Sequence, residues 1–345
     1  MADVAERAGV SVATVSRALS GSRTVDPQLA DRVTRAAEEL GYRVNLVGRA
    51  LRQTRSSTVG LIVPDLDNPF FSALAQHLAR AFTETDSDLL VYSADSSLAT
   101  ELRGVHSFLG RQVDALVMIP VHEQGSAAAV DLAAAVVPTV QLDRCVPSTH
   151  AHFVGVNNHR GMELVGEHVG TWVDRKQQPV VLIGAEPSSS SAHERLDGFR
   201  RVFGEDTPVL LGSFSTEWGH TAAQRLLDEG WKQATIVTAA DVIAVGVLAQ
   251  ILHRGHSVPG DFRVVGFDGV GAAALAQPTL TTIRQPVEAM TLAIRDLIEA
   301  GASEGHPGGV ANDHDDGPGV AHRFDPMFVP GETSPAEHLG SPTRA

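Results

Sequence analysis

The sequence predicts two parts of different fold class: a small all-α helix-turn-helix head and an α/β body of two doubly wound parallel-sheet subdomains. The head is indicated by residues 2–20, where two short helical segments flank a turn at Gly9. The body is indicated by continuous apolar segments that alternate with helical segments from Thr58 onward. Strands of this composition are typical of parallel sheets that are covered on both faces. Two such series of strands follow one another, so we expect two lobes.

The head is expected to contain three short helices. The first ends at Ala8-Gly9, and Ser11 is placed to cap the second. The third opens with Asp26-Pro27, an N-cap followed by a first-turn proline, and stops at Gly41. Apolar side chains at helical spacing should form the shared core: Val4, Ala8, Val10, Val15, Leu19, Leu29, Val33, Ala37 and Leu40.

The segment YRVNLVGRALRQTRSST joins the head to the body. Asn45 can cap a helix from Leu46 to Leu51, and a helix this short is marginal in water, so we expect it to fold on binding a partner. A polar stretch from Gln53 to Thr58 then leads into the body. We therefore divide the chain into a helix-turn-helix head at 1–43, a hinge helix and linker at 44–57, a body at 58–334 and a disordered tail at 335–345.

The first series of strands in the body is TVGLIV, DLLVYS, ALVMIP and PTVQL, and the second is FVGV, PVVLIG, PVLLG, ATIVT and FRVVGFD. Helical stretches such as 72–83 and 101–110 lie between them. We expect the chain to cross between the lobes near 157–160 and 283–290. Ligands of such folds bind outside the carboxyl ends of the strands and between the lobes.

The C-terminal part is rich in Gly, Asp and His. Residues 301–320, GASEGHPGGVANDHDDGPGV, form a low-complexity stretch that we interpret as a flexible loop. Residues 321–330 are expected to return as a strand, and the tail after Pro330 is expected to be disordered.

Charge is distributed unevenly along the 345 residues, whose formal net charge is −14. Residues 1–56 contain nine arginines, no lysine and six acidic residues, which gives +3 and leaves −17 for the remainder. A basic head on an acidic body favours a nucleic-acid-binding module joined to a regulatory domain. The acidic body would also repel DNA outside the head.

One cysteine, Cys145, excludes an internal disulfide framework and fits a reducing compartment. The N-terminus has no signal segment, and no apolar run approaches membrane-spanning length. We therefore expect a cytoplasmic protein with no membrane partner.

Several motifs, taken together, resemble the lactose-repressor/galactose-repressor family of bacterial transcription regulators. They are DVAERAGVSVATVSRALSG, AAEELGYRVN, VPDLDNPFF, QLDR, VVGFDG and TTIRQP, and the resemblance covers roughly residues 2–300 and resumes near 321–334. It implies a body similar to periplasmic sugar-binding proteins. It also implies a repressor that binds a palindromic operator in double-stranded DNA as a homodimer or a tetramer. Relatives usually carry polar residues before Asp3, so either those phosphate contacts are absent here or the true start lies upstream.

The resemblance places Val12 and Ala13 where the family has its base-reading side chains. Both are apolar here, so they can contact a thymine methyl group but cannot hydrogen-bond to a base. Arg17 can reach guanine or phosphate. Phosphate contacts are implied for Ser11, and for Thr14 and Ser16 unless these two are simply exposed to solvent.

In the hinge, Leu51 corresponds to the leucine that relatives wedge into the minor groove, although it could instead pack against the body. Asn45 and Arg49 are further DNA-contact candidates. Val44 and Gly48 replace the usual proline and alanine. Since glycine costs about 1 kcal/mol relative to alanine in a helix, we expect a hinge that depends on DNA to fold.

The resemblance also assigns effector-binding positions, all at strand ends or in the loops that follow them. Aromatic faces there can stack on a sugar ring, while Asp and Arg bind vicinal hydroxyls, and the same set could hold a purine. Ala240 stands where sugar binders usually have asparagine, and His193 stands where some of them have arginine. These two differences favour a modified or larger sugar over a common pentose. The aromatic residues could instead belong to the core. The effector-binding positions are Asn68, Phe70, Phe71, Asp143, Arg144, His193, Arg195, Phe214, Asp241, Asp268 and Gln285.

Two other classes of protein fit the sequence less well. An enzyme could use the serines at 188–191 beside His193, but no nucleophile-elbow glycines surround them and no phosphate-binding glycine loop follows the first strand. A metal could bind the loop that contains His306, Asn312, Asp313, His314, Asp315 and Asp316, but its spacing fits no rigid site. We therefore expect no enzymatic activity, cofactor or metal. A binding protein without a DNA role would have an accidental helical head, and the absence of an export signal disfavours it.

The expected mechanism is conformational. A small molecule that closes the cleft would rotate the N-terminal lobes of a dimer and separate the hinges, through its differential affinity for two states. Induction and co-repression would use the same pocket.

Overall fold

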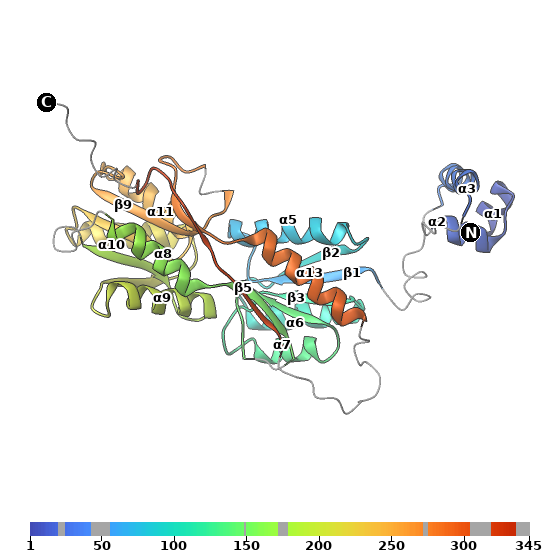
Figure 1. Ribbon diagram of the computed structural model, residues 1–345, viewed down its shortest axis with the longest axis horizontal. Helices are drawn as coiled ribbons and strands as arrows, with labels where there is room; N and C mark the ends of the chain where they lie inside the picture. Colours follow the sequence, from blue (N-terminus) through green and yellow to red (C-terminus); the bar gives the residue numbers. More distant parts are fainter. Residues whose placement is uncertain are drawn as a thin grey trace. The chain divides into compact units, whose positions relative to one another are not determined.

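The computed structural model describes residues 1–19, 25–42, 56–147, 150–171, 179–271, 275–303 and 319–335. The chain forms two compact units, residues 1–56 and 57–345, coloured along the sequence in Figure 1. The first contains α1 (Ala2–Ala8), α2 (Val12–Leu19) and α3 (Pro27–Glu39). The second contains two sheets with helices on both faces, which confirms the predicted fold class. Within the described ranges, no helix is long and apolar enough to cross a membrane.

The ends of the head helices follow from local residue chemistry. Gly9 adopts the left-handed conformation that ends α1, with φ 62°, and the Val10 amide donates to the Ala5 carbonyl at 3.0 Å. Asp26 caps α3 by accepting from the amides of Gln28 and Leu29. The predicted caps and turn are therefore present.

The three head helices share one apolar core, as the helical spacing predicted. Its buried members are Val4, Ala5, Ala8, Val15, Val33, Ala36 and Ala37. Leu40 was expected to join this core but is 48% exposed, because α3 ends at Glu39 and Leu40 lies in the turn that follows. Leu29 is half-buried.

The N-terminal lobe of the body is built on a six-stranded sheet of order β11-β5-β4-β3-β1-β2. One face packs against α5 and α13, and the other packs against α6 and α7. The strands are β1 (Thr58–Val63), β2 (Asp88–Ser93), β3 (Ala115–Met118), β4 (Thr139–Leu142), β5 (His152–Val156) and β11 (Ala321–Phe324). The helices are α5 (Pro69–Thr83), α6 (Leu98–Gly110), α7 (Ala127–Ala134) and α13 (Val287–Ser303).

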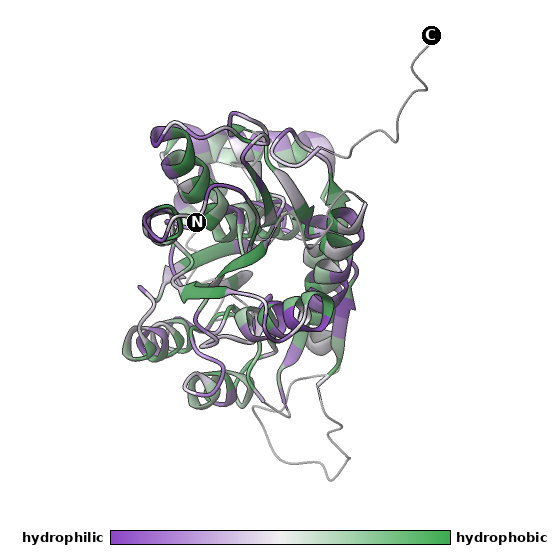
Figure 2. Ribbon diagram, turned by 90° about the vertical axis from the view of Figure 1, so that its left-hand side faces the viewer, coloured by the Kyte–Doolittle hydropathy of each residue, from purple (hydrophilic) through white to green (hydrophobic). Residues whose placement is uncertain are grey.

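The C-terminal lobe has the same plan, with a sheet of order β12-β10-β9-β8-β6-β7. Helices α10 and α11 cover one face, and α8 and α9 cover the other. Figure 2 shows the hydrophobic residues along the central strands. The strands are β6 (Val180–Ala185), β7 (Val209–Gly212), β8 (Ala234–Thr238), β9 (Phe262–Asp268), β10 (Thr281–Arg284) and β12 (Met327–Val329). The helices are α8 (Asn158–Gly170), α9 (Ser190–Phe203), α10 (Thr216–Asp228) and α11 (Asp241–His253).

Two expectations about strands were wrong. FVGV was assigned to the second series, but β5 pairs in parallel with β4 and therefore belongs to the first sheet. The stretch 321–330 is not one strand, because Asp325-Pro326 divides it into β11 and β12, which lie in different sheets. Within the described residues the chain thus passes between the lobes after β5, after β10 and after β11.

The residues directly after β12 are packed rather than disordered, which corrects the expectation for the tail beyond Pro330. Thr333 and Ser334 are fully buried. The Thr333 hydroxyl donates to the Val264 carbonyl at 2.7 Å and accepts from the Thr281 amide at 2.9 Å. Hydrogen bonds to β9 and β10 therefore fix this segment to the C-terminal lobe. Residues 336–345 lie outside the described ranges.

Candidate functional site

The start of α2 presents the side chains that were predicted to contact DNA. Val12 is 47% exposed, and Ser11, Ala13 and Arg17 are also exposed. An exposed valine at a helix start is available for an apolar contact such as a thymine methyl group. The Arg17 Nε atom donates to the Ala13 carbonyl at 3.3 Å, so its side chain lies along the helix surface.

Some hydroxyls of this helix already have partners within the head. The Ser11 hydroxyl accepts from the Thr14 amide at 3.1 Å and lies 2.9 Å from the Thr14 hydroxyl. Thr14 and Ser16 are half-buried. Ser11 therefore caps α2, and a phosphate contact by its hydroxyl would share that role.

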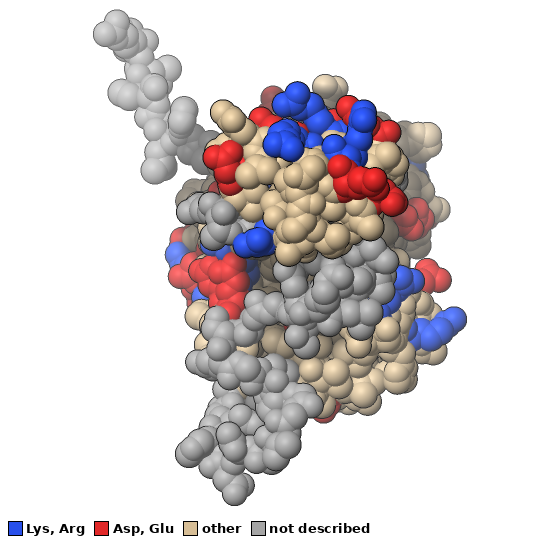
Figure 3. Space-filling model, turned by 90° about the vertical axis from the view of Figure 1, so that its right-hand side faces the viewer, with Lys and Arg blue, Asp and Glu red and all other residues tan. Residues whose placement is uncertain are grey.

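The positive charge of the head does not lie on its helices. Residues 1–19 and 25–42 hold four arginines against six acidic residues, so the remaining five arginines account for the positive balance. Arg7 is paired with Glu39 at 2.6 Å. Figure 3, which faces the N-terminal unit, shows basic side chains with acidic ones beside them. The five arginines elsewhere in the unit are Arg23, Arg43, Arg49, Arg52 and Arg55.

The hinge predictions fall outside the described residues. This applies to the expected helix from Leu46 to Leu51 and to its departures from the family pattern, Val44 and Gly48. It applies equally to the three predicted DNA contacts Asn45, Arg49 and Leu51.

In the body, two carboxylates lie at equivalent strand ends of the two lobes. Asp143 follows β4 and Asp268 ends β9, and both are almost fully buried. Both have a positive backbone φ, 61° for Asp143 and 118° for Asp268, which residues other than glycine rarely adopt. Residues held in such conformations cluster at functional sites. Because both carboxylates lie at the carboxyl ends of their strands, the junction between the lobes is the candidate effector site.

Arg195 and Gln285 join the two carboxylates. Arg195 Nη1 lies 3.1 Å from Asp268 Oδ1, and its Nη2 lies 3.8 Å from Asp143 Oδ1. Gln285 Nε2 donates to Asp268 Oδ1 at 2.9 Å and to Asp143 Oδ1 at 3.4 Å. A side chain from α9 and one from the crossover after β10 therefore bridge the two lobes.

Arg144 lies between aromatic rings of both lobes. Its guanidinium carbon is 5.3 Å from the centroid of the Phe71 ring and 5.2 Å from that of Phe214. Its Nε atom lies 3.9 Å from Asp143 Oδ2 and is buried without a hydrogen bond, as is Gln285 Oε1. Buried polar atoms without partners carry a desolvation cost that a ligand can relieve.

The electrostatics of the junction are dominated by burial. Loss of hydration raises the pKa of Asp268 to about 6, against the lowering effect of the Arg195 charge. Burial also raises the pKa of Asp143, opposed by the charges of Arg195 and Arg144, and lowers the pKa of Arg144. Two buried carboxylates and two buried guanidinium groups thus compensate one another within about 4 Å.

The other predicted effector residues have different partners. Asn68 uses its side-chain oxygen to cap α5, and Phe70 is buried in the core of the N-terminal lobe. His193 is largely exposed at the edge of the junction, 3.4 Å from Glu123 of the other lobe. Asp241 is buried, and its carboxylate is occupied by neighbouring protein groups. Ala240 is buried at the start of α11.

Two residues of the site were not predicted from the sequence. Asn158 accepts from Arg195 Nε at 2.8 Å and donates to Glu194 Oε2 at 2.7 Å. Glu194 in turn binds both terminal nitrogens of Arg323. Asn158 is the second residue after β5, in the NN that follows FVGV, and this place near a strand end could have identified it. Glu194 had no comparable signal.

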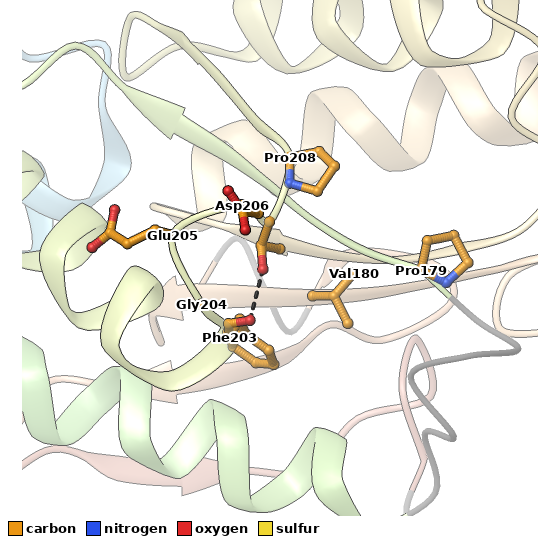
Figure 4. Close-up of a pocket in the computed structure, with 8 residues that line it drawn as sticks. Pro179, Val180, Phe203, Gly204, Glu205, Asp206 and Pro208 are labelled. Atoms are coloured by element: carbon orange, nitrogen blue, oxygen red, sulfur yellow. Dashed lines mark hydrogen bonds between the residues drawn. The ribbon is translucent and has the colours of Figure 1, made fainter.

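A separate pocket of about 400 Å³ lies in the C-terminal lobe (Figure 4). Pro179 and Val180 stand at the amino end of β6, and Thr207 and Pro208 precede β7. Since effectors of this fold class bind at the carboxyl ends of strands, this pocket is at the opposite edge. Within the described residues, no group of three or more His, Cys, Asp or Glu side chains could hold a metal ion.

Comparison with known proteins supports both units. Residues 1–45 match the model of bacterial regulatory proteins of the lacI family, and residues 59–294 match that of the periplasmic binding protein domain. Catabolite control protein A of Priestia megaterium is 29% identical over 300 residues, which cover 83% of this chain and 87% of the relative.

Two solved structures are similar over nearly the whole chain, both with 25% sequence identity. The Lac repressor dimer bound to operator and the anti-inducer ONPF has a TM-score of 0.78, with 97% of this chain and 98% of that chain covered. A transcriptional regulator CelR–cellobiose complex has a TM-score of 0.68, with 96% and 98% covered. The chain therefore belongs to the lacI family of bacterial regulatory proteins, with a DNA-binding head and a periplasmic-binding-protein-like body.

Proposed function

We propose that this protein is a transcriptional repressor that binds a palindromic operator as a homodimer and responds to a small molecule at the junction between its lobes. The observation that carries the proposal is the buried cluster of Asp143, Asp268, Arg195 and Gln285, at strand ends of both lobes. A ligand that bonds to both lobes changes the balance between their open and closed arrangements. Two heads would occupy successive major-groove half-sites, and the regulator would act in the cytoplasm without enzymatic activity.

The effector is proposed to be an uncharged sugar or sugar derivative. The charges of the two acidic and two basic side chains at the junction compensate one another. The site therefore offers no excess charge to balance that of a charged ligand. Gln285 Oε1 can accept from a hydroxyl and Arg144 Nε can donate to one, which is the combination that a polyol satisfies. The Phe71 and Phe214 rings supply apolar faces. One similar structure holds cellobiose, a neutral disaccharide.

A thermal-shift screen of the full chain tests this assignment. Neutral mono- and disaccharides, nucleobases and sugar phosphates would each be added at the same concentration. We expect a neutral sugar to raise the Tm, since a ligand that binds only the folded state at 100 times its Kd contributes about 2.7 kcal/mol. The same sugar should change operator affinity. A response only to nucleobases or sugar phosphates would contradict the sugar assignment, and turnover of the sugar would favour an enzyme.

The proposed dimer places a second copy of the chain on the free edge of the N-terminal sheet. The edge strand β2 exposes Leu90 (38%) and Val91 (43%), and the neighbouring α6 exposes Leu98 (41%) and Leu102 (37%). Apolar side chains on an edge strand are a liability unless a partner covers them. The Lac repressor dimer, which this chain resembles, supplies the precedent for a second copy as that partner.

Replacing Leu90 and Val91 together by glutamate is expected to shift the protein to monomers in sedimentation. Because one head contacts one half-site, operator affinity should fall by about 100-fold or more. Val136, which is 48% exposed after α7, provides the control, and its replacement by glutamate should leave both properties unchanged. A double variant that stays dimeric would show that the interface lies elsewhere.

A further inference from the structure

We propose that Asp241 is a positioning residue of the effector site: it fixes the turn after β9 so that the Asp268 carboxylate faces Arg195 and Gln285. The family resemblance implies instead that Asp241 touches the effector. The inference rests on the proposed function for the identity of the site, but the contacts that carry it lie within the protein.

Both oxygens of the Asp241 carboxylate accept hydrogen bonds from the protein. Oδ2 accepts from the amides of Gly269 at 2.8 Å and Val270 at 3.1 Å. Oδ1 accepts from the Thr282 hydroxyl at 2.6 Å. The residue is 1% exposed, so a ligand would have to displace protein groups to reach it.

These bonds hold a turn that is unfavourable by itself. Asp268 has φ 118° and Gly269 has φ 68°. A Cβ atom on Gly269 would lie 2.5 Å from the Arg284 Cα, so this close approach requires glycine. Strained conformations of this kind persist only where the surrounding structure over-determines them. Asp241 supplies two of the bonds that do so, directly beyond Asp268.

The same carboxylate connects the two strands that carry the ligand-facing groups. Asp268 ends β9, and Thr282 lies on β10, three residues before Gln285. Gly266 on β9 leaves room for this contact, since a Cβ there would be 2.3 Å from Asp241 Oδ1. From the first turn of α11, Asp241 therefore sets the relative position of Asp268 and Gln285, whose own contact is 2.9 Å.

Asparagine in place of Asp241 can keep these hydrogen bonds, whereas alanine cannot. An amide oxygen can accept from Gly269 and Val270, and the amide nitrogen can donate to the Thr282 hydroxyl, which can also act as an acceptor. We therefore compare Asp241→Asn with Asp241→Ala in the full chain. Glu101→Ala is the matched control, because Glu101 is a buried carboxylate of the other lobe that accepts from the Val121 amide at 2.9 Å.

The first measurement needs no ligand. Hydrogen exchange followed by mass spectrometry on peptides covering 266–272 should show exchange of the Gly269 and Val270 amides about tenfold faster in Asp241→Ala. Asp241→Asn and Glu101→Ala should keep the wild-type rates at these amides. If Asp241→Ala does not fold, Thr282→Val, which removes one donor to the carboxylate, should accelerate the same amides. Unchanged exchange in the folded variants would overturn the proposal.

The second measurement is a double-mutant cycle with cellobiose as the first probe, followed by the neutral sugar that gives the largest thermal shift. We expect Asp241→Ala to weaken binding about tenfold or more in the wild-type background, and to have no further effect once Asp268 is replaced by asparagine. An equal loss in both backgrounds would mean that Asp241 acts independently of Asp268, which would overturn the proposal. If no sugar binds the wild-type protein, the sugar assignment fails, while the exchange experiment still decides the role of Asp241.

Discussion

Replacing Asp268 by alanine is expected to abolish the effector response and to destabilise the body. Arg195 would lose its carboxylate partner at 3.1 Å and would keep only Asp143, at 3.8 Å. The Arg195 and Asp268 side chains are each 3% exposed, so water cannot replace the lost partner. Removing one partner of a buried ion pair typically costs about 3–5 kcal/mol, because the remaining charge stays out of water. Against a typical domain stability of about 5–15 kcal/mol, this is a large fraction. Urea unfolding of the full chain measures it.

Asp268→Asn separates the loss of charge from the loss of contacts. The amide oxygen can still accept from Arg195 Nη1 and Gln285 Nε2, so the fold should be retained. We expect this variant to bind operator normally and to respond weakly to the sugar that stabilises the wild-type protein. Wild-type sugar affinity in Asp268→Ala would place the effector site elsewhere in the chain.

Replacing Arg49, Arg52 and Arg55 by glutamine is expected to have the second large effect, a loss of operator affinity that depends on salt. The described head helices carry fewer basic than acidic residues, so the balance in favour of DNA comes from arginines outside them. If each linker arginine neutralises one phosphate, a dimer would lose six contacts. The slope of log K against log salt would then become shallower by about 5, and affinity near 0.15 M salt would fall about a thousandfold or more.

The control replaces three exposed arginines of the body, Arg103, Arg111 and Arg201, by glutamine, which changes the net charge equally. This triple variant should bind operator as the wild type does, because the body is acidic and is not proposed to touch DNA. Fluorescence anisotropy with an operator duplex at several salt concentrations measures both sets. An unchanged slope in the linker variant would mean that the phosphates are contacted by Arg17 and its neighbours.

The fold class was predictable because the two periodic patterns are strong. Continuous apolar segments such as TVGLIV and ATIVT became central strands, and the caps at Ser11 and Asp26 formed as local chemistry dictates. Sheet membership was not predictable in the same way. Nothing within FVGV distinguishes a last strand of one sheet from the first strand of the next, because only pairing with β4 decides it.

Polar residues were the least predictable part. Thr333 and Ser334 look like a solvent-exposed tail, yet the Thr333 hydroxyl and the Ser334 amide complete the hydrogen bonding of β9 and β10. The family resemblance assigned Asp143, Arg195, Asp268 and Gln285 to the site, and the strand-end rule agreed with it, although Arg195 lies within α9. It could not separate them from Asp241, because a carboxylate that binds backbone amides and one that faces a ligand have the same sequence signature.

The three crossings between the lobes have a consequence for how the protein is made. The N-terminal lobe includes α13 and β11, so its sheet is incomplete until the ribosome has passed Phe324. One face of this sheet packs against both α5 and α13, and α13 contributes Met290, Ile294 and Ile298 to the core. Until α13 has been synthesised, part of that face therefore stays uncovered in the nascent chain. Neither lobe can therefore finish folding during synthesis before the other is nearly complete, and a chain truncated before α13 would expose apolar surface in both.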